Sequence, residues 1–153
     1  MFKTPVNILL VDDERDFVEM LSLRLKEFGK KVTPAYSGAE CLEKLKANNI
    51  DVIILDIKMP GMDGMETLKE IKSRFPLVEV IMLTGHGSIE TAVDGMKIGA
   101  FDYILKPANL EDLLEKITEA KKNKEAQEER IRKAENHALL MESRKGGRSP
   151  FPG

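Results

Sequence analysis

Five short apolar runs recur within the first 105 residues, and they constrain the fold more than any other feature of the sequence. They are rich in Ile, Val and Leu and cover Val6–Val11, Lys31–Tyr36, Asp51–Leu55, Glu79–Leu83 and Phe101–Leu105. In three of them, NILLV, DVIIL and EVIML, every residue after the first is apolar, with no alternation with polar residues. Continuous runs of this kind are typical of strands buried on both faces of a parallel sheet.

Segments with helical spacing separate the runs. Apolar stripes lie at Phe17, Leu21, Leu25 and Phe28, at Leu42 and Leu45, at Met65, Leu68 and Ile71, and at Ile89, Ala92, Val93 and Met96. Helix starts are signalled by Ser37 with Glu40, by Ser88 and by Asn109 with Asp112, and helix ends by Gly29 and Gly99. Strict alternation of strands and helices predicts a doubly wound α/β fold, with a five-stranded parallel sheet and right-handed crossovers.

Composition limits the classes of protein to which the chain can belong. With 153 residues, 42% hydrophobic and 33% charged, it fits one soluble globular domain. No apolar stretch has the length of a membrane span, and the N-terminus lacks the features of a signal peptide. Cys41 is the single cysteine, so we expect a small buried hydrophobe in a reducing cytoplasm. The net charge of −2 argues against direct nucleic-acid binding.

Polar side chains follow four of the predicted strands. Asp12 and Asp13 follow the first strand, Asp56 the third, Thr84 the fourth and Lys106 the fifth. In doubly wound sheets, ligands bind at the carboxyl ends of strands where the strand order reverses. Each residue alone is explained as a helix cap, a loop hydroxyl or a solvated charge. Their coincidence at the ligand-binding edge favours a functional site.

The residue types at this edge suggest phosphoryl transfer. Three carboxylates form a hard oxygen site suited to Mg²⁺, which would relieve their mutual repulsion. Asp56 could then attack phosphorus and form an acyl phosphate. Lys106 can neutralise charge, and the Thr84 hydroxyl can donate a hydrogen bond to a phosphoryl oxygen.

Four motifs, ILLVDDE, DVIILDIKMPGMDG, LTGHG and GAFDYILKP, in this order and spacing, resemble the receiver domain of two-component response regulators. The resemblance covers about residues 4–120. The stretch TGHGSIETAVDGMKIGAFDYILKP is similar to receivers of nitrogen-regulation-type transcription activators. The resemblance implies a flavodoxin-like (βα)5 fold with strand order 2-1-3-4-5, here followed by an extended C-terminal helix.

The resemblance also assigns roles around the acidic cluster. Asp56 would be the phosphoacceptor, Asp13 a direct Mg²⁺ ligand, and Asp12 a ligand acting mainly through metal-bound water. Besides Asp56, the remaining protein ligand would be the backbone carbonyl of Lys58. Lys58 and His86 occupy the variable positions that tune dephosphorylation in this family.

A second group of residues is implied to form the switch. Lys106 would pair with the phosphoryl group, and its bond to Pro107 is cis in the family. Thr84 and Tyr103 resemble the switch pair that reshapes the surface of the fourth helix, fifth strand and fifth helix on phosphorylation. Gly95 in the fourth helix either weakens that helix, by roughly 1 kcal/mol relative to Ala, or permits close packing.

The tail carries a heptad pattern with a weak middle. Apolar or small residues occupy positions 110, 113, 117, 120, 131, 134, 138 and 141, with polar Lys124 and Gln127 between. A parallel pair would bring Arg130 next to Glu135 of a second chain, and Lys116 next to Lys121. The alternative is one charged helix that frays beyond about residue 125. We therefore divide the chain into a receiver (1–122), a helical extension that either forms a coiled coil or stays single (123–143) and a disordered tail (144–153).

These observations predict a phosphoacceptor switch, not an enzyme. A sensor histidine kinase or phosphotransfer protein would donate the phosphoryl group to Asp56. A homodimer would use either the face of the fourth helix, fifth strand and fifth helix or the C-terminal helix, and no membrane is involved. One alternative, an aspartyl phosphatase, lacks its general acid because Lys58 stands in that place. Another, a phosphorylation-independent interaction module of receiver fold, stays open, as does whether the chain stands alone or belongs to a longer regulator.

Overall fold

The structure, a computed structural model, describes residues 5–58, 63–85 and 89–148, with side chains up to Arg144. Five strands alternate with five helices. The elements are β1 (Asn7–Val11), α1 (Arg15–Glu27), β2 (Lys31–Ala35), α2 (Gly38–Ala47), β3 (Val52–Asp56), α3 (Gly64–Arg74), β4 (Glu79–Thr84), α4 (Ile89–Ile98), β5 (Asp102–Leu105) and α5 (Leu110–Arg148).

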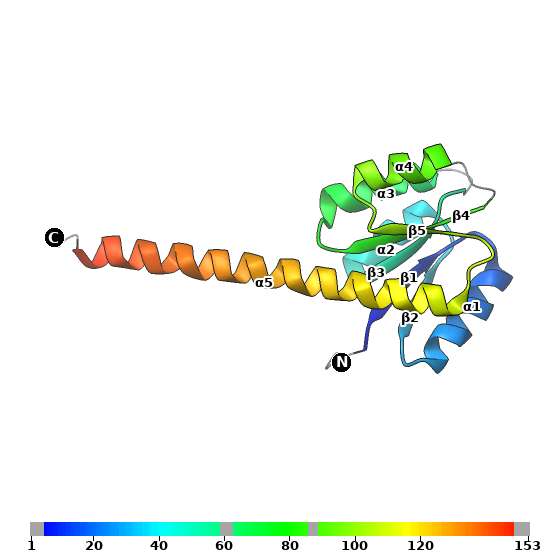
Figure 1. The fold of residues 1–153 in the computed structure, drawn as a ribbon, viewed down its shortest axis with the longest axis horizontal. Coiled ribbons are helices and arrows are strands. Elements are labelled where there is room, and N and C mark those ends of the chain that lie inside the picture. Colours follow the sequence, from blue (N-terminus) through cyan, green and yellow to red (C-terminus); the bar gives the residue numbers. More distant parts are fainter. Residues whose placement is uncertain (1–4, 59–62, 86–88, 149–153) are drawn as a thin grey trace.

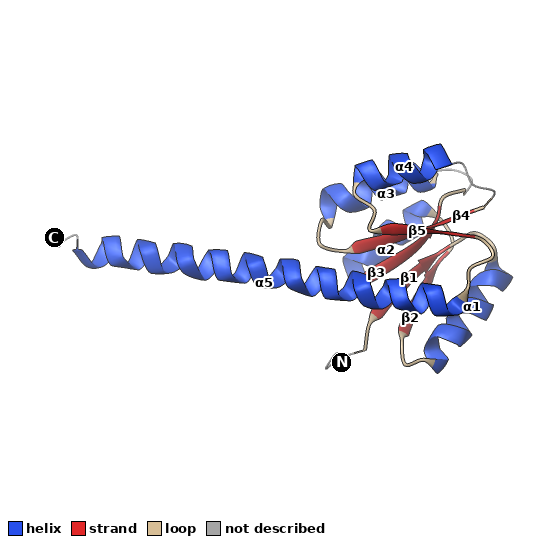
Figure 2. Ribbon diagram, in the orientation of Figure 1, coloured by secondary structure: helices blue, strands red, loops and turns tan. Residues whose placement is uncertain are grey.

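The five strands form one parallel sheet in the order β2-β1-β3-β4-β5 (Figures 1 and 2). This confirms the predicted doubly wound α/β fold and its strand order. The register aligns the carboxyl ends of the central strands, because Leu55 of β3 pairs with Val11 of β1 and with Met82 of β4. The polar residues that follow these strands therefore reach the same edge of the sheet.

Continuous apolar strands supply a core on each face of the sheet. Leu9 and Val11 contribute to the core under α2 and α3, while Ile8 and Leu10 contribute to the core under α1 and α5. Alternate side chains of one strand are thus buried on opposite faces, which accounts for the absence of polar residues in these runs. Cys41 lies in the first core, where burial raises the pKa of its thiol to about 12, as expected of a structural cysteine.

Helix ends follow the predicted signals where the structure describes them. Ser37 Oγ accepts a hydrogen bond from the Glu40 backbone N–H at 3.1 Å, and Asn109 Oδ1 accepts one from Asp112 at 3.1 Å. Gly29, with φ +80°, ends α1 in the left-handed conformation. Ser88, predicted to open the fourth helix, lies outside the described residues.

Two predicted apolar stripes are wrong in part. In α1 the structure buries Val18 with Leu21 and Leu25, whereas Phe28 is 55% exposed. In α4 the buried residues are Ala92 and Gly95, and the three large residues of the stripe are exposed: Ile89, Val93 and Met96. The physical reason is that α4 packs against β4 through its small residues, at a distance that leaves no room for a side chain at position 95. A Cβ on Gly95 would overlap the Met82 side chain. Gly95 thus brings α4 close to β4.

Helix α5 leaves the domain as a single long helix (Figure 1). Its first turns pack on the sheet through Leu113, Ile117 and Ala120, which are fully buried. The structure continues the helix to Arg148, past residue 125, where one of the two alternatives from the sequence has it fray. Residues 144–148, assigned from the sequence to the disordered tail, are therefore helical, and the remainder of that tail lies outside the described residues.

Polar contacts also hold the first half of α5 against the domain. Lys121 Nζ and Lys124 Nζ lie 3.0 and 3.4 Å from Asp51 Oδ1, and all three side chains are buried. Lys116 pairs with Asp102 at 2.6 Å. Each of these lysines therefore has an acidic partner in its own domain, which offsets the repulsion expected between Lys116 and Lys121 of two paired chains.

No helix within the described ranges combines the length and the apolarity needed to cross a membrane.

Candidate functional site

The predicted site residues converge at the carboxyl edge of the sheet. Each of Asp12, Asp13 and Asp56 offers a carboxylate oxygen, and these oxygens lie within 4.8 Å of one another. Lys106 Nζ is 2.9 Å from Asp12 Oδ2 and 3.7 Å from Asp56 Oδ1. The structure thus assembles three carboxylates and one ammonium from the ends of β1, β3 and β5.

Backbone hydrogen bonds orient the two buried carboxylates. Asp12, which is fully buried, accepts a hydrogen bond from the Glu14 N–H at 2.9 Å through Oδ1, leaving Oδ2 to Lys106. Asp56, 5% exposed, accepts one from the Lys58 N–H at 3.2 Å. Asp13 is exposed. Two acids are therefore held in place by the backbone, while the third faces solvent.

The electrostatics of the cluster raise the pKa of Asp56 to about 6. Burial is the main cause and the charge of Asp12 the next, while Lys106 and the Lys58 N–H act in the opposite direction. Burial alone would lower the pKa of Lys106, but its hydrogen bond to Asp12 and the neighbouring carboxylates outweigh burial and raise it. One ammonium faces three carboxylates, so the cluster lacks positive charge.

The donor set fits a hard divalent cation. Mg²⁺ is commonly held by one or two carboxylates together with waters. The carboxylate oxygens at this edge lie close enough to one another for a single ion to contact them all. A cation here would supply the missing positive charge. Lys58, expected to contribute its carbonyl, follows Asp56 by two residues and has an exposed side chain. His86, expected at the second variable position, lies outside the described residues.

Thr84 ends β4 beside the cluster and carries an unsatisfied hydroxyl. Within the described part of the chain, its Oγ1 is the one buried side-chain nitrogen or oxygen without a hydrogen-bond partner. Leaving such a group unpaired costs about 1–3 kcal/mol, so native proteins rarely tolerate it without a reason. Tyr103 of β5, the other predicted switch residue, is 39% exposed.

Sequence reasoning missed two neighbours of the lysine. Glu14 Oε1 lies 3.7 Å from Lys106 Nζ, and the ring centroid of Phe17 lies 4.8 Å from the same atom. Glu14 adjoins the two predicted acids in the sequence, which is a signal that could have included it. Phe17 was expected only as part of an apolar helix stripe, and its spacing alone could not reveal the contact.

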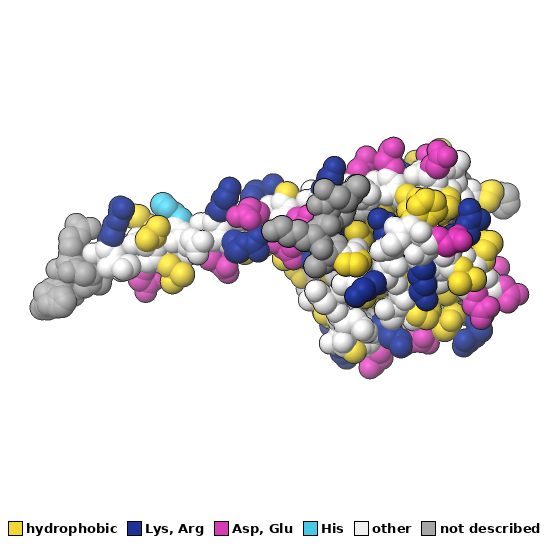
Figure 3. Space-filling view, turned by 90° about the horizontal axis from the view of Figure 1, so that it is seen from below, with side chains coloured by type: hydrophobic (Ala, Val, Ile, Leu, Met, Phe, Trp, Pro, Cys, Tyr) yellow, Lys and Arg dark blue, Asp and Glu magenta, His cyan; other side chains and the backbone are white. Residues whose placement is uncertain are grey.

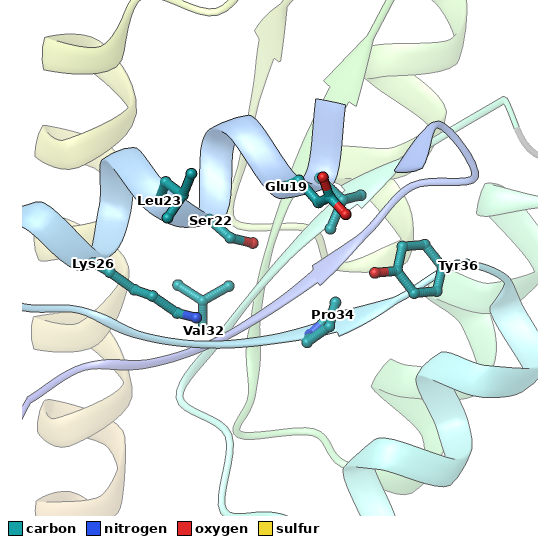
Figure 4. Close-up of a pocket in the computed structure, with 8 residues that line it drawn as sticks. Glu19, Ser22, Leu23, Lys26, Val32, Pro34 and Tyr36 are labelled. Carbon is teal, nitrogen blue, oxygen red and sulfur yellow. The ribbon is translucent and has the colours of Figure 1, made fainter. Parts of the chain in front are cut away.

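A separate groove of about 310 Å³ lies between α1 and β2 (Figure 4). Ser22 and Leu23 line it from α1, and Val32 and Pro34 from β2. Its end is formed by Tyr36. None of its lining residues belongs to the acidic cluster, so we assign the chemistry to the cluster instead of the groove.

Comparison with known proteins identifies relatives of this chain. The family model described as response regulator receiver domain matches residues 8–118. The transcriptional regulatory protein ZraR of Klebsiella oxytoca is 40% identical over 115 residues, covering 75% of this chain and 26% of that protein. A putative NtrX-like response regulator of Rickettsia bellii is 41% identical over 111 residues, covering 71% of this chain and 23% of that protein. The chain thus spans about a quarter of the length of these curated relatives.

A solved structure supports the same relationship. The crystal structure of a response regulator receiver domain protein from Clostridium thermocellum superposes with a TM-score of 0.76 at 40% identity. The match covers 80% of this chain and 98% of that one. The similarity to an NtrX-like regulator also agrees with the likeness to nitrogen-regulation-type receivers that residues 84–107 carry.

Proposed function

The chain belongs to the response regulator receiver domain family, and from this premise we propose that it is a Mg²⁺-dependent switch whose phosphoacceptor is Asp56. The observation that carries the proposal is the convergence of Asp12, Asp13 and Asp56 with Lys106, next to the unsatisfied hydroxyl of Thr84. The alternative, an interaction module that needs no phosphorylation, does not explain why these five side chains lie together.

The reaction is attack of Asp56 on phosphorus. One carboxylate oxygen bonds to phosphorus while the phosphorus–nitrogen bond of the donor phosphohistidine breaks, and the imidazole nitrogen keeps that electron pair and takes up a proton. Asp12, Asp13, Asp56 and the Lys58 carbonyl would hold Mg²⁺, which neutralises phosphoryl charge when bound. Asp56 is well suited to attack because its Oδ1 is held by the Lys58 N–H.

Lys106 and Thr84 stabilise the transferred group. Lys106 Nζ, already within 3.7 Å of Asp56, exchanges part of its contact with Asp12 for a phosphoryl oxygen. The Thr84 hydroxyl donates to another phosphoryl oxygen, which satisfies the one buried side-chain nitrogen or oxygen left unpaired in the described residues. Phosphorylation thus draws Thr84 toward Asp56.

The output is a changed protein-interaction surface. Movement of Thr84 frees space for the half-exposed ring of Tyr103 to turn inward. The surface that this alters carries exposed apolar residues of α4 and β5, namely Ile89, Val93, Met96, Tyr103 and Leu105. Such a patch fits a protein partner, whether a second copy or a downstream target.

The donor would be a sensor histidine kinase or phosphotransfer protein in the cytoplasm, where the lone buried Cys41 stays reduced. The chain acts as a signalling switch that catalyses only its own phosphorylation and dephosphorylation. With a net charge of −2, this segment itself has no role in direct nucleic-acid binding.

The test is intact mass after incubation with acetyl phosphate and Mg²⁺. The wild type should gain one phosphoryl group, and the gain should vanish in Asp56→Asn and in the presence of EDTA. Asp94→Asn, which changes an exposed acid of α4 in the same way, should behave as the wild type. A folded wild type that gains no mass and binds no beryllium fluoride would favour the interaction-module alternative.

A further inference from the structure

The ammonium of Lys106 has an aromatic neighbour. The ring centroid of Phe17, in the first turn of α1, lies 4.8 Å from Lys106 Nζ. This separation is within the range of about 6 Å over which a ring attracts a cation through its quadrupole. Phe17 is half-buried and packs against the core under α1 and α5, and this packing limits the movement of its ring.

The other neighbours of the ammonium are acids. Asp12 lies 2.9 Å away, and Asp56 and Glu14 each lie 3.7 Å away. These oxygens hold the lysine, but they take the same N–H donors that a phosphoryl oxygen needs. A ring attracts an ammonium without competing through a strong acceptor. The Lys106 side chain is 22% exposed, so it is only partly in contact with water.

We propose that Phe17 is a positioning residue for phosphoryl transfer, which keeps the Lys106 ammonium at the acidic edge while its hydrogen bonds pass from Asp12 to the phosphoryl group. This inference rests on the proposed role of Lys106. The lysine stem is flexible, so a fixed neighbour that stays in contact during the exchange limits the positions open to the ammonium. Phe17 acts through Lys106 and does not itself touch the reacting atoms.

A purely structural role gives a different expectation. Phe17 continues the spacing of Leu21 and Leu25 on α1, and a core residue at that position could be replaced by Leu with little effect on the reaction. A positioning ring requires an aromatic face, so Tyr should replace it and Leu should not. The pair Phe17→Leu and Phe17→Tyr therefore separates the two roles.

The experiment measures the phosphorylation rate with acetyl phosphate and Mg²⁺, without any kinase, so that contacts with a partner protein do not contribute. Phe17→Leu should slow the reaction by about 3- to 10-fold, while Phe17→Tyr should stay within about twofold of the wild type. Phe28→Leu is the matched control, because it makes the same change at an exposed position just after α1. Mg²⁺ affinity and the unfolding midpoint are measured for each variant to exclude loss of the site or the fold.

Carbon-13-labelled lysine gives a readout that does not depend on phosphorylation. The ring should shift the side-chain proton resonances of Lys106 upfield, and the shift should disappear in Phe17→Leu. The inference is overturned if Phe17→Leu reacts at the wild-type rate, if Phe17→Tyr is as slow as Phe17→Leu, or if no ring-dependent shift is found. In those cases a phosphorylated wild type leaves the proposed function standing. A wild type that accepts no phosphoryl group overturns both proposals.

Discussion

At the scale of single residues, the charge on Asp56 opposes folding when no metal is bound. Its pKa is raised from the ordinary 3.8 to about 6, mainly by burial, so it gives up its proton less readily in the folded chain than in the unfolded one. The proton on Asp56 therefore stabilises the folded chain. This stabilisation is complete below pH 3.8 and is lost as the pH rises through about 6. A shift of this size corresponds to at most about 3 kcal/mol at neutral pH.

We accordingly expect Asp56→Asn to stabilise the metal-free protein. At pH 7.5 the free energy of unfolding should rise by about 1–3 kcal/mol, because the neutral amide removes the cost of burying a charge and the repulsion by Asp12. The gain should shrink below pH 6. Urea unfolding in EDTA at both pH values measures this. An equal difference between the two proteins at pH 5 and pH 7.5 would contradict the electrostatic origin of the gain.

Mg²⁺ should stabilise the wild type and so offset part of the difference in stability between the wild type and Asp56→Asn. A ligand at ten times its dissociation constant stabilises the state that binds it by about 1.4 kcal/mol, and we expect this gain in the wild type. Asp13→Asn should lose most of the gain without lowering the metal-free stability, because Asp13 is exposed and its charge adds only a small repulsion to Asp56. Thermal melts over a Mg²⁺ titration measure both effects. A full Mg²⁺ response in Asp13→Asn would remove that residue from the ligand set.

At the scale of elements, the start of α3 packs directly on the end of β3. A Cβ on Gly64 would overlap the backbone of Ile57 and Asp56, and the Gly64 N–H donates to the Ile57 carbonyl at 3.0 Å. The backbone cannot yield as a side chain would, so Gly64→Ala should cost about 2–3 kcal/mol and weaken phosphorylation of Asp56. Gly85→Ala is the control, since nothing lies within 4 Å of its added carbon. Chemical unfolding and intact mass report the two effects.

The contact between α5 and the sheet should depend on Asp51. Asp51→Asn would remove the carboxylate that Lys121 and Lys124 share, while Glu125 and Glu128 stay within reach of them. We therefore expect a cost of about 1–3 kcal/mol, less than for a buried charge left with no partner. Glu43→Gln disrupts an exposed pair with Lys46 and should cost under about 1 kcal/mol. Urea unfolding compares the two. Equal losses would show that burial of the Asp51 pair carries no special weight.

The elements also show why sequence predicts some features and not others. Strands buried on both faces leave apolar runs in the sequence, so the parallel sheet and the residues at its carboxyl edge were predictable from the residues. The strand order was predicted only through the resemblance to receiver domains. α4 packs through small residues, and hydrophobic spacing could not indicate that Gly95 would face Met82. Lys124 was read as a polar gap in a heptad because its partner Asp51 is remote in the sequence. Contacts between distant residues carry no local pattern.

At the scale of the whole molecule, the chain is a receiver with a long projecting helix. Beyond Lys124, α5 has no core beneath it, and Figure 3 shows hydrophobic side chains scattered among charged ones along the projection. Exposed apolar residues include Ile131, Leu139, Leu140 and Met141. The heptad positions 110, 113, 117 and 120 are largely buried in the domain itself, so only the second half of the predicted seam is free for another chain.

We expect the projecting helix to pair in parallel with that of a second copy, since most helical stability comes from packing of an apolar face and the apolar residues of this projection are exposed. Ile131 and Met141 lie on the heptad seam, whereas Leu139 lies off it. Changing both seam residues to Lys should therefore convert a dimer to a monomer in sedimentation equilibrium, while Leu139→Lys should leave the dimer intact. Far-ultraviolet circular dichroism should show helix loss only in the seam variant. A wild type that sediments as a monomer at high concentration would instead make α5 a single charged helix, and the output would then depend on the exposed face of α4 and β5.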